Sequence, residues 1–192
     1  MSSISDHIRT TDTWKEIHAQ PGIWRAWADE FNLEEIRTWV DAQEIQEVWF
    51  YGAGTSTQIG DIIASGITLS GKPKILSVPS TDLVAQPSFY LKSAPISLLI
   101  VNFDRSGNSG ESEGTLRTVE ALAANAVMLN ITFNPEGALA KSTIGRSILL
   151  PAACHDAGFA MTSSFSTMLL TALAIFDRST DLRKNFLKLT YL

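Results

Sequence analysis

Short, continuous apolar runs that each lead into a loop constrain the fold of this chain more than any other feature. A sheet with one face in water needs alternating apolar and polar residues, whereas a parallel sheet covered on both faces needs continuous apolar strands. Five such strands are expected, at residues 48–51, 75–78, 96–102, 127–132 and 147–150. The pattern therefore predicts an α/β fold, a three-layer sandwich whose five-stranded parallel sheet has helices on both faces.

Helical segments are expected between these strands and before them. Those within the sheet region cover residues 58–70, 111–124 and 161–176, with a short helical turn at 137–140. The stretch up to Asp41 has apolar residues at helical spacing, and Pro21 should divide it into two pieces. Its four tryptophans are expected to pack against the core, with a partner surface as the alternative.

Composition limits the class of protein and its partners. A chain of 192 residues with 45% hydrophobic residues can bury one substantial core. A net charge of −5 argues against a broad basic surface for nucleic acid or anionic lipid. The charge-free stretch 158–176 approaches the length of a membrane helix, but Ser and Thr crowd its first half, so we expect a buried helix instead. A soluble protein with a small-molecule partner follows.

The cysteine content and the N-terminus indicate the compartment. Cys154 is the one cysteine, so it cannot form an internal disulfide, and no Cys/His spacing resembles a metal site. The first seven residues have neither the cationic start nor the apolar core of a secretory signal. We therefore expect a cytoplasmic protein.

The loop at residues 104–112 carries groups that suit an anion. The side chains expected to donate hydrogen bonds to the anion are Arg105, Ser106, Asn108 and Ser109. Gly107 permits a sharp turn, and the start of the following helix is positively polarised. These features predict phosphate binding. The alternative is that Ser109 serves as the N-cap of the helix, with Ser112 and Glu113 nearby.

Two further loops follow expected strands and should reach the same edge of the sheet. The loop at residues 52–56 is Gly-rich, but Thr57 replaces the third glycine of a dinucleotide fingerprint, so Ser56 is better suited to a sugar or phosphate oxygen. A tight turn with a Thr or Ser cap is the alternative. The loop at residues 155–164 brings hydroxyl groups to the last helix. His155 there can transfer protons, or it is a surface residue making local hydrogen bonds.

Taken together, these loops resemble the sugar isomerase (SIS) domain family. Five motifs carry the resemblance, in this order: Trp14-Lys15-Glu16-Ile17, Gly52-Ala53-Gly54-Thr55-Ser56, Pro79-Ser80-Thr81-Asp82-Leu83-Val84, Arg105-Ser106-Gly107-Asn108-Ser109 and Gly158-Phe159-Ala160-Met161-Thr162-Ser163-Ser164. They are most similar to the tagatose-6-phosphate ketose/aldose isomerase branch, also described as galactosamine-6-phosphate deaminase/isomerase. Members normally carry two SIS domains, and the resemblance covers the first, over residues 14–177.

The resemblance implies a domain division and a set of ligand contacts. Residues 1–45 would form an N-terminal helical extension, 46–180 the phosphosugar-binding SIS domain and 181–192 a C-terminal tail. The contacts expected to hold the sugar phosphate are Ser56, Ser106, Ser109 and Ser163, followed by Asn108 and Thr162. No metal or redox cofactor is implied. SIS domains assemble as homo-oligomers, dimers or higher, with sites near the interfaces.

The implied activity is that of an aldose–ketose isomerase or deaminase of amino-sugar catabolism, which acts on a hexose 6-phosphate. His155 is the best local candidate for the general base, followed by Glu111 and Glu113, and further acids and bases are expected from a second SIS domain or a neighbouring subunit. A non-catalytic phosphosugar-binding module is the alternative function.

The sequence departs from the family at two positions of the loop at residues 104–112. Asp104 stands where a small neutral residue is usual, and Gly110 stands where proline is usual. A carboxylate beside a dianionic phosphate would repel it unless the carboxylate points away or pairs with Arg105.

Overall fold

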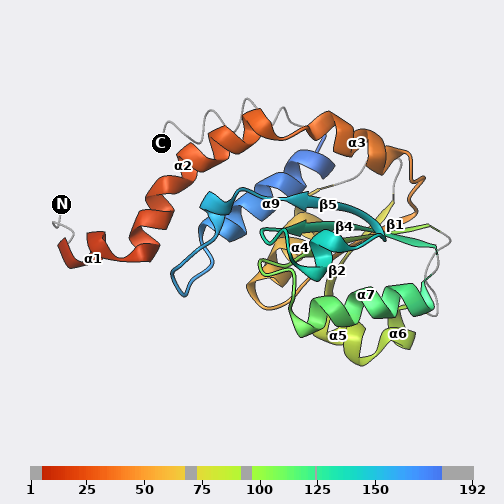
Figure 1. Ribbon diagram of the computed structural model, residues 1–192. Coiled ribbons are helices and arrows are strands. Elements are labelled where there is room, and N and C mark those ends of the chain that lie inside the picture. Colours follow the sequence, from red (N-terminus) through yellow and green to blue (C-terminus); the bar gives the residue numbers. More distant parts are fainter. Residues whose placement is uncertain (1–5, 68–72, 92–96, 124, 179–192) are drawn as a thin grey trace.

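The structure is a computed structural model that describes residues 6–67, 73–91, 97–123 and 125–178, so the tail expected at 181–192 lies outside the described residues. Five parallel strands form one sheet in the order β2-β1-β3-β4-β5 (Figure 1). The strands are β1 Glu47–Gly52, β2 Lys74–Pro79, β3 Leu98–Phe103, β4 Ala126–Thr132 and β5 Gly145–Leu149. The predicted five-stranded parallel sheet is thereby confirmed, and each observed strand overlaps its expected range.

Helices cover both faces of this sheet and so complete the predicted three layers (Figure 1). Their bounds are α1 Asp6–Thr10, α2 Asp12–Glu30, α3 Leu33–Asp41, α4 Thr55–Gly66, α5 Ser80–Ala85, α6 Pro87–Leu91, α7 Gly110–Leu122, α8 Ala138–Lys141 and α9 Ser163–Phe176, with a 3₁₀ turn at Ala152–Cys154. Core residues of α3, α4 and α9 pack on one face, and those of α5, α6 and α7 pack on the other.

Successive residues of a strand supply the two cores. Phe50 of β1 belongs to the core under α4 and α9, whereas Trp49 and Tyr51 belong to the core under α5 and α7. All three are at most 3% exposed. Because both sides of the strand are covered, both sets of positions must be apolar or satisfied internally, which explains the continuous apolar runs.

Pro21 does not divide the N-terminal stretch where the sequence predicted. It lies inside the continuous helix α2. Proline lacks the N–H that would bond the carbonyl of Ile17, and it normally kinks or breaks a helix. Here α2 has no buried residue, so water can reach the carbonyl that loses its partner. The chain instead breaks after Glu30, before α3.

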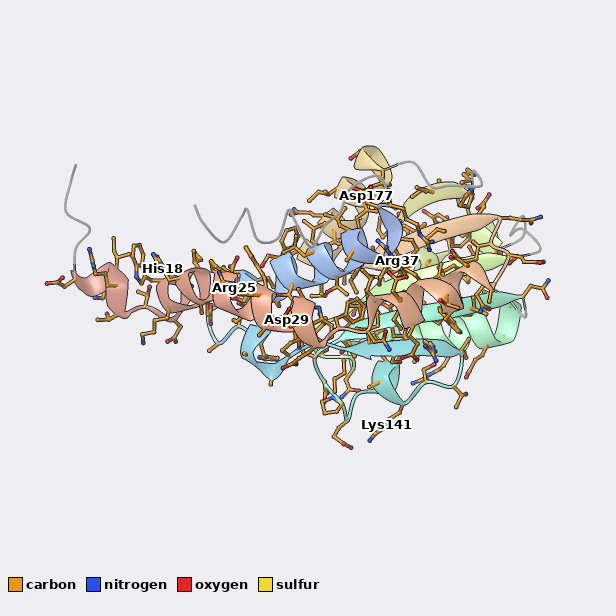
Figure 2. All side chains as sticks on the ribbon, turned by 90° about the horizontal axis from the view of Figure 1, so that it is seen from above. His18, Arg25, Asp29, Arg37, Lys141 and Asp177 are labelled. Atoms are coloured by element: carbon orange, nitrogen blue, oxygen red, sulfur yellow. The ribbon has the colours of Figure 1, made fainter. Side chains whose placement is uncertain are left out.

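The N-terminal helices contact the core only in part. Trp27 and Trp39 pack against the core under α9, and the Trp27 indole N–H donates to Thr171 Oγ1 at 2.9 Å. The predicted core role is confirmed for these two. Helix α1 and the first part of α2 extend away from the sheet (Figures 1 and 2), where Trp14 stacks on His18 with ring centroids 3.9 Å apart.

Most of the charge-free stretch forms helix α9, which is largely buried in the protein core. It begins at Ser163, and nine of its fourteen residues are buried against α2, α3 and α4 or the sheet. The guanidinium of Arg37 from α3 binds the last turn of α9, where it donates to the carbonyl of Ala174 at 2.6 and 3.1 Å. Among the described residues no helix has both the length and the apolar content to cross a bilayer.

Candidate functional site

Three loops follow strands β1, β3 and β5 beyond the carboxyl edge of the sheet: the first loop at residues 52–56, the second at 104–112 and the third at 155–164. Parallel pairing aligns the strand ends there: Gly52 pairs with Phe103 and Ile131 pairs with Ile148. The expectation that the loops face one edge follows directly from this topology.

The first loop leaves the start of α4 without a side-chain cap. Gly54 is the N-cap residue and offers no acceptor, so the expected alternative of a Thr or Ser cap is wrong. Ser56 is 5% exposed, and its N–H donates to the Ala53 carbonyl at 3.0 Å. A Cβ added at Gly52 would lie 2.8 Å from the carbonyl carbon of Ser56, so only glycine allows this close approach. The Thr57 N–H likewise donates to the Gly54 carbonyl at 3.1 Å, whereas the Ser56 hydroxyl makes no hydrogen bond within the described residues and can serve an external acceptor.

The second loop is organised around the carboxylate of Asp104. Its Oδ1 accepts from the N–H and the hydroxyl of Ser106, both at 2.9 Å. Its Oδ2 accepts from the hydroxyl of Ser109 at 2.8 Å, from the Ser109 N–H at 3.3 Å and from the hydroxyl of Ser112. The carboxylate thus neither points away from the loop nor pairs with Arg105, which were the two arrangements expected to spare a bound phosphate.

Hydrogen bonds keep Asp104 ionised. Burial raises the pKa of its carboxyl, but the hydrogen bonds from Ser112, Ser109, Ser106 and the Gly107 N–H favour the charged form more strongly. The pKa is therefore lowered below its ordinary value, and the second loop carries a fixed negative charge at neutral pH.

The remaining predicted residues of this loop have mixed positions. Ser109 is the N-cap of α7 and accepts from the Ser112 N–H at 3.2 Å, which confirms the capping alternative. Asn108 uses its amide oxygen to accept from the Ala138 N–H at 2.8 Å. Arg105 is half-buried and makes neither a hydrogen bond nor an ion pair within the described part of the chain.

The segment after β4, which includes α8, holds the second loop in place through hydrogen bonds. The Leu139 N–H donates to the Gly107 carbonyl at 3.1 Å, and the Asn134 side chain donates to the Ser106 carbonyl at 2.8 Å. Gly107 has φ +67°, and a Cβ there would lie 2.8 Å from Thr132 Oγ1, so the turn requires glycine on both grounds. The loop is held from several sides.

The third loop has a carboxylate of its own. Asp156 is 3% exposed and accepts from the N–H groups of Thr162, Ser163 and Ser164 at 2.8 to 3.1 Å and from the hydroxyls of Thr162 and Ser164. Burial raises the pKa of Asp156, but these hydrogen bonds outweigh burial and lower it. The loop's donors at the start of α9 are therefore already satisfied.

Glu16 from α2 takes up the rest of the third loop's donors. Its Oε1 accepts from the N–H groups of Ala157 at 2.6 Å and Gly158 at 2.9 Å, and the Ser163 hydroxyl donates to the Glu16 carbonyl at 3.1 Å. Ser163, predicted as a ligand contact, is thus 1% exposed and bonded to α2. Glu16 stands in a motif of the sequence, but no local signal tied it to a loop more than 140 residues away.

The three candidate bases differ in their surroundings. His155 is exposed, makes no side-chain hydrogen bond among the described residues and turns its ring edge-on to Phe133. Glu111 lies in the first turn of α7. Glu113 forms an ion pair with Arg117 at 2.8 Å. The structure therefore places no orienting partner beside His155 within the described residues.

Tyr51 ties the second loop's helix to the sheet. Its hydroxyl contacts Thr115 of α7 and donates to the carbonyls of Ser80 and Glu111, each at 3.3 Å. Burial raises the pKa of this phenol, so it stays protonated as a donor. It fixes the starts of α5 and α7 relative to β1.

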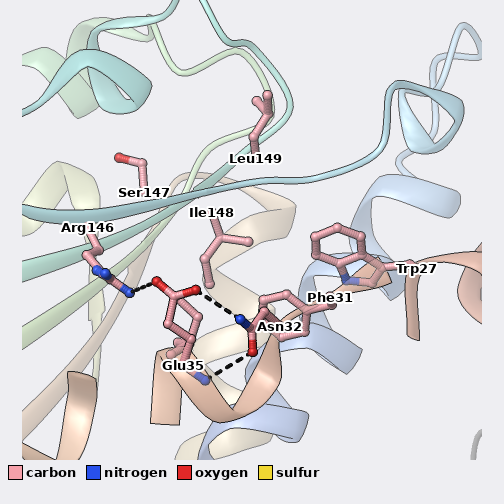
Figure 3. Close-up of a pocket in the computed structure, with 9 residues that line it drawn as sticks. Trp27, Phe31, Asn32, Glu35, Arg146, Ser147, Ile148 and Leu149 are labelled. Carbon is pink, nitrogen blue, oxygen red and sulfur yellow. Dashed lines mark hydrogen bonds and ion pairs between the residues drawn. The ribbon is translucent and has the colours of Figure 1, made fainter. Parts of the chain in front are cut away.

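A surface pocket of about 280 Å³ lies elsewhere, between the outer edge of β5 and helices α2 and α3 (Figure 3). Glu35 accepts there from Arg146 at 2.7 Å and from the side chain of Asn32 at 3.0 Å. None of the predicted site residues lines it. Within the described ranges, no group of three or more His, Cys, Asp and Glu residues is placed to hold a metal ion.

Known proteins are similar in sequence to this chain over most of its length. It is 38% identical over 184 residues to a D-galactosamine-6-phosphate deaminase AgaS of Escherichia coli, which covers 88% of this chain and 47% of that protein. It is 35% identical over 175 residues to the protein of the same name from Shewanella sp. (strain ANA-3), covering 85% and 45%. The chain spans about half the length of these relatives. No family model matches it.

Solved structures share the fold. The tagatose-6-phosphate ketose/aldose isomerase of Escherichia coli superposes with a TM-score of 0.79 at 35% identity, over 93% of this chain and 51% of that one. A glucosamine-6-phosphate deaminase from Thermotoga maritima gives a TM-score of 0.67 at 22% identity over 94% and 52%, which supports the fold alone.

Proposed function

Because this chain belongs to the sugar isomerase (SIS) domain family, we propose that it binds a hexose 6-phosphate as part of an aldose–ketose isomerase or deaminase. The observation that carries the proposal is its 38% identity to a galactosamine-6-phosphate deaminase over 88% of the chain. The three loops at one sheet edge support it, because open parallel sheets bind ligands there. Galactosamine 6-phosphate and tagatose 6-phosphate are the proposed ligands.

The groups free to donate define the proposed contacts. Ser56 stands in the first turn of α4, which has no side-chain cap, and Arg105 has no partner among the described residues. The Asn108 side-chain N–H₂ is a third donor, because within the part of the chain that the structure describes only the amide oxygen of Asn108 is engaged in a side-chain hydrogen bond. Thr162 and Ser163 hold the third loop in place, with Asp156 and Glu16 as their acceptors. Ser106 and Ser109 complete the phosphate contacts once Asp104 releases them.

The proposed chemistry is proton transfer through an enediol or enolamine intermediate. Contacts to the phosphate supply remote binding energy and hold the reacting carbons near a general base. His155 and Glu111 are the candidate bases of this chain, and the other acids and bases come from a second SIS domain or a neighbouring subunit. A His155→Ala variant of the complete, active assembly should lose turnover; unchanged turnover would exclude His155 as the base.

A non-catalytic phosphosugar-binding module is the second candidate. One observation favours it: His155, the best candidate base, is exposed and makes no side-chain hydrogen bond among the described residues that would orient it. Such a module would sense the ligand without converting it.

One experiment separates the two functions. The purified chain is incubated with galactosamine 6-phosphate or tagatose 6-phosphate, and sugar product and ammonia are followed while binding is measured by calorimetry. Turnover supports the enzyme, and binding without turnover supports the module. Absence of both, with no rise in melting temperature at millimolar phosphosugar, would contradict the proposed function altogether.

We also propose a homo-oligomer in the cytoplasm. Helix α1 and the exposed part of α2, with Ile8 and Ile17 about half exposed, are the surface proposed to meet a second copy. Light scattering after gel filtration should give at least twice the 21.0 kDa mass of the chain. A monomeric mass would contradict the assembly and weaken the case for activity.

A further inference from the structure

The second loop already holds an anion of its own. Five hydrogen bonds from three serines converge on the Asp104 carboxylate at the start of α7. These donors, hydroxyls and N–H groups at a helix N-terminus, are the kind that bind a phosphate oxygen. Ser106 and Ser109, the predicted phosphate contacts of this loop, are both among them.

The hydrogen bonds from these donors use the full acceptor capacity of the Asp104 carboxylate. Two carboxylate oxygens offer about four lone-pair directions. In this loop Oδ1 accepts two hydrogen bonds and Oδ2 accepts three. Asp104 therefore has no acceptor capacity left for a ligand's own donors, and the serines have no inward-facing hydroxyl left for a ligand's oxygens.

A phosphate and this carboxylate cannot share the loop. Both are anions, and at contact distance in a half-buried site they repel with little screening. Arg105 does not neutralise Asp104, because it makes no ion pair within the described residues. The hydrogen bonds also lower the pKa of Asp104, so protonation does not relieve the repulsion near neutral pH.

We propose that Asp104 determines ligand specificity as a built-in competitor: it occupies the second loop's anion position, and the phosphate of a sugar gains these donors only by displacing it. The inference rests on the proposed function, since it concerns the phosphate end of that same site. It means that this chain binds hexose 6-phosphates more weakly than its loops would otherwise allow, whereas its affinity for the unphosphorylated sugar is unaffected.

The test removes the competitor and keeps the donors. Asp104→Gly vacates the anion position, and Asp104→Asn is the matched control, since an amide of the same shape still fills it. Affinities for inorganic phosphate, galactosamine 6-phosphate and galactosamine are measured by calorimetry. We expect Asp104→Gly to bind both phosphates about tenfold tighter or more than the wild type, and galactosamine equally. Asp104→Asn should gain much less.

Two further measurements connect the gain to this loop. Adding Ser106→Ala and Ser109→Ala to Asp104→Gly should abolish the gain. Without phosphate, Asp104→Gly should melt at a lower temperature than the wild type because the loop's donors lose their acceptor. Millimolar phosphate should raise its melting temperature by more than it raises that of the wild type. Asp104→Ser is measured in parallel with the same expectation, in case the glycine variant does not fold.

Each outcome decides the inference. Tighter phosphate binding in the folded glycine or serine variant, lost with the two alanines, supports it. If the wild type and the variant bind galactosamine 6-phosphate equally, Asp104 does not compete, and the proposed function stands without this inference. If neither folded protein binds any phosphosugar or phosphate, both are wrong.

Discussion

In two loops of this protein, a single carboxylate occupies the position where other α/β proteins bind a ligand. Asp104 and Asp156 each collect the donors at the start of a helix, α7 and α9 respectively. Anionic groups at helix N-termini satisfy N–H groups that have no partner in the helix and interact favourably with its dipole. They differ in exposure, because Asp156 is fully buried while Asp104 is half-buried and borders the loop surface.

The burial of Asp156 makes it the more important of the two for stability. Asp156→Ala leaves the N–H groups of Ser163 and Ser164 and two hydroxyls without their acceptor. We expect the free energy of unfolding to fall by about 3 kcal/mol, measured by urea denaturation. The control, Asp12→Ala, removes an exposed carboxylate that forms an ion pair with Lys15 and should cost less than about 1 kcal/mol. Equal losses in both variants would contradict this role.

Acid should weaken the fold through the same two residues. A carboxyl whose pKa is lower in the folded state adds stability above its unfolded pKa, and that stability disappears as the pH falls through the folded value. Asp104 and Asp156 both have lowered pKa values. Melting temperature should therefore be constant with respect to these groups near neutral pH and should fall below about pH 4. In the Asp104→Asn and Asp156→Asn variants the acid-dependent fall should be smaller; an unchanged slope would exclude these carboxyls as its cause.

At the scale of elements, α2 works as a clamp on the third loop. Glu16 and the Glu16 carbonyl bind the loop, while Gln20 accepts from the Ser166 hydroxyl at 3.2 Å. Gly158 fits beneath this helix because a Cβ there would lie 2.7 Å from Thr13 Oγ1. The helix has no buried residue of its own, so these polar contacts add to the few apolar ones made by its second half.

Removing the Glu16 side chain from this clamp should loosen the third loop and leave the rest of the fold unchanged. In Glu16→Ala, amide hydrogen exchange should accelerate at Ala157 and Gly158, whose N–H groups lose their acceptor. Exchange in the sheet should not change. Glu30→Ala, an exposed carboxylate at the end of the same helix, is the matched control and should leave the loop protected. Protection retained at Ala157 in Glu16→Ala would contradict the clamp.

Elements were predictable from the sequence where local pattern decided them. The continuous apolar strands and the loops after them could be predicted because a doubly covered parallel sheet leaves that pattern. Helices α5 and α6 were not predicted, since they are single short turns without an amphipathic stripe. The continuity of α2 through Pro21 could not be predicted, because it depends on this segment lying at the surface.

The candidate site was predictable only as far as its loops. Ser109 could be named as a donor or a cap from its position before α7, and it is a cap. That Asp104 faces inward could not be foreseen, because the direction of a side chain depends on the folded loop and on the β4 loop behind it. The partners of Glu16 lie more than 140 residues away, beyond any local signal.

At the scale of the whole molecule, one α/β domain brings the start of α4 to the same sheet edge as the second and third loops. The second and third loops are filled by the chain's own carboxylates, whereas the start of α4 has no side-chain cap. Ligand binding should therefore depend first on the first loop, through Ser56.

Calorimetric titration of galactosamine 6-phosphate into the wild type and Ser56→Ala tests the proposed phosphosugar site at this edge. The wild type should bind, and Ser56→Ala should bind about tenfold more weakly, since one hydrogen bond to a charged oxygen is lost. Its melting temperature without ligand should not change, because no protein acceptor depends on that hydroxyl among the described residues. Equal affinities in the two proteins, or no binding by the wild type, would contradict a phosphosugar site at this edge.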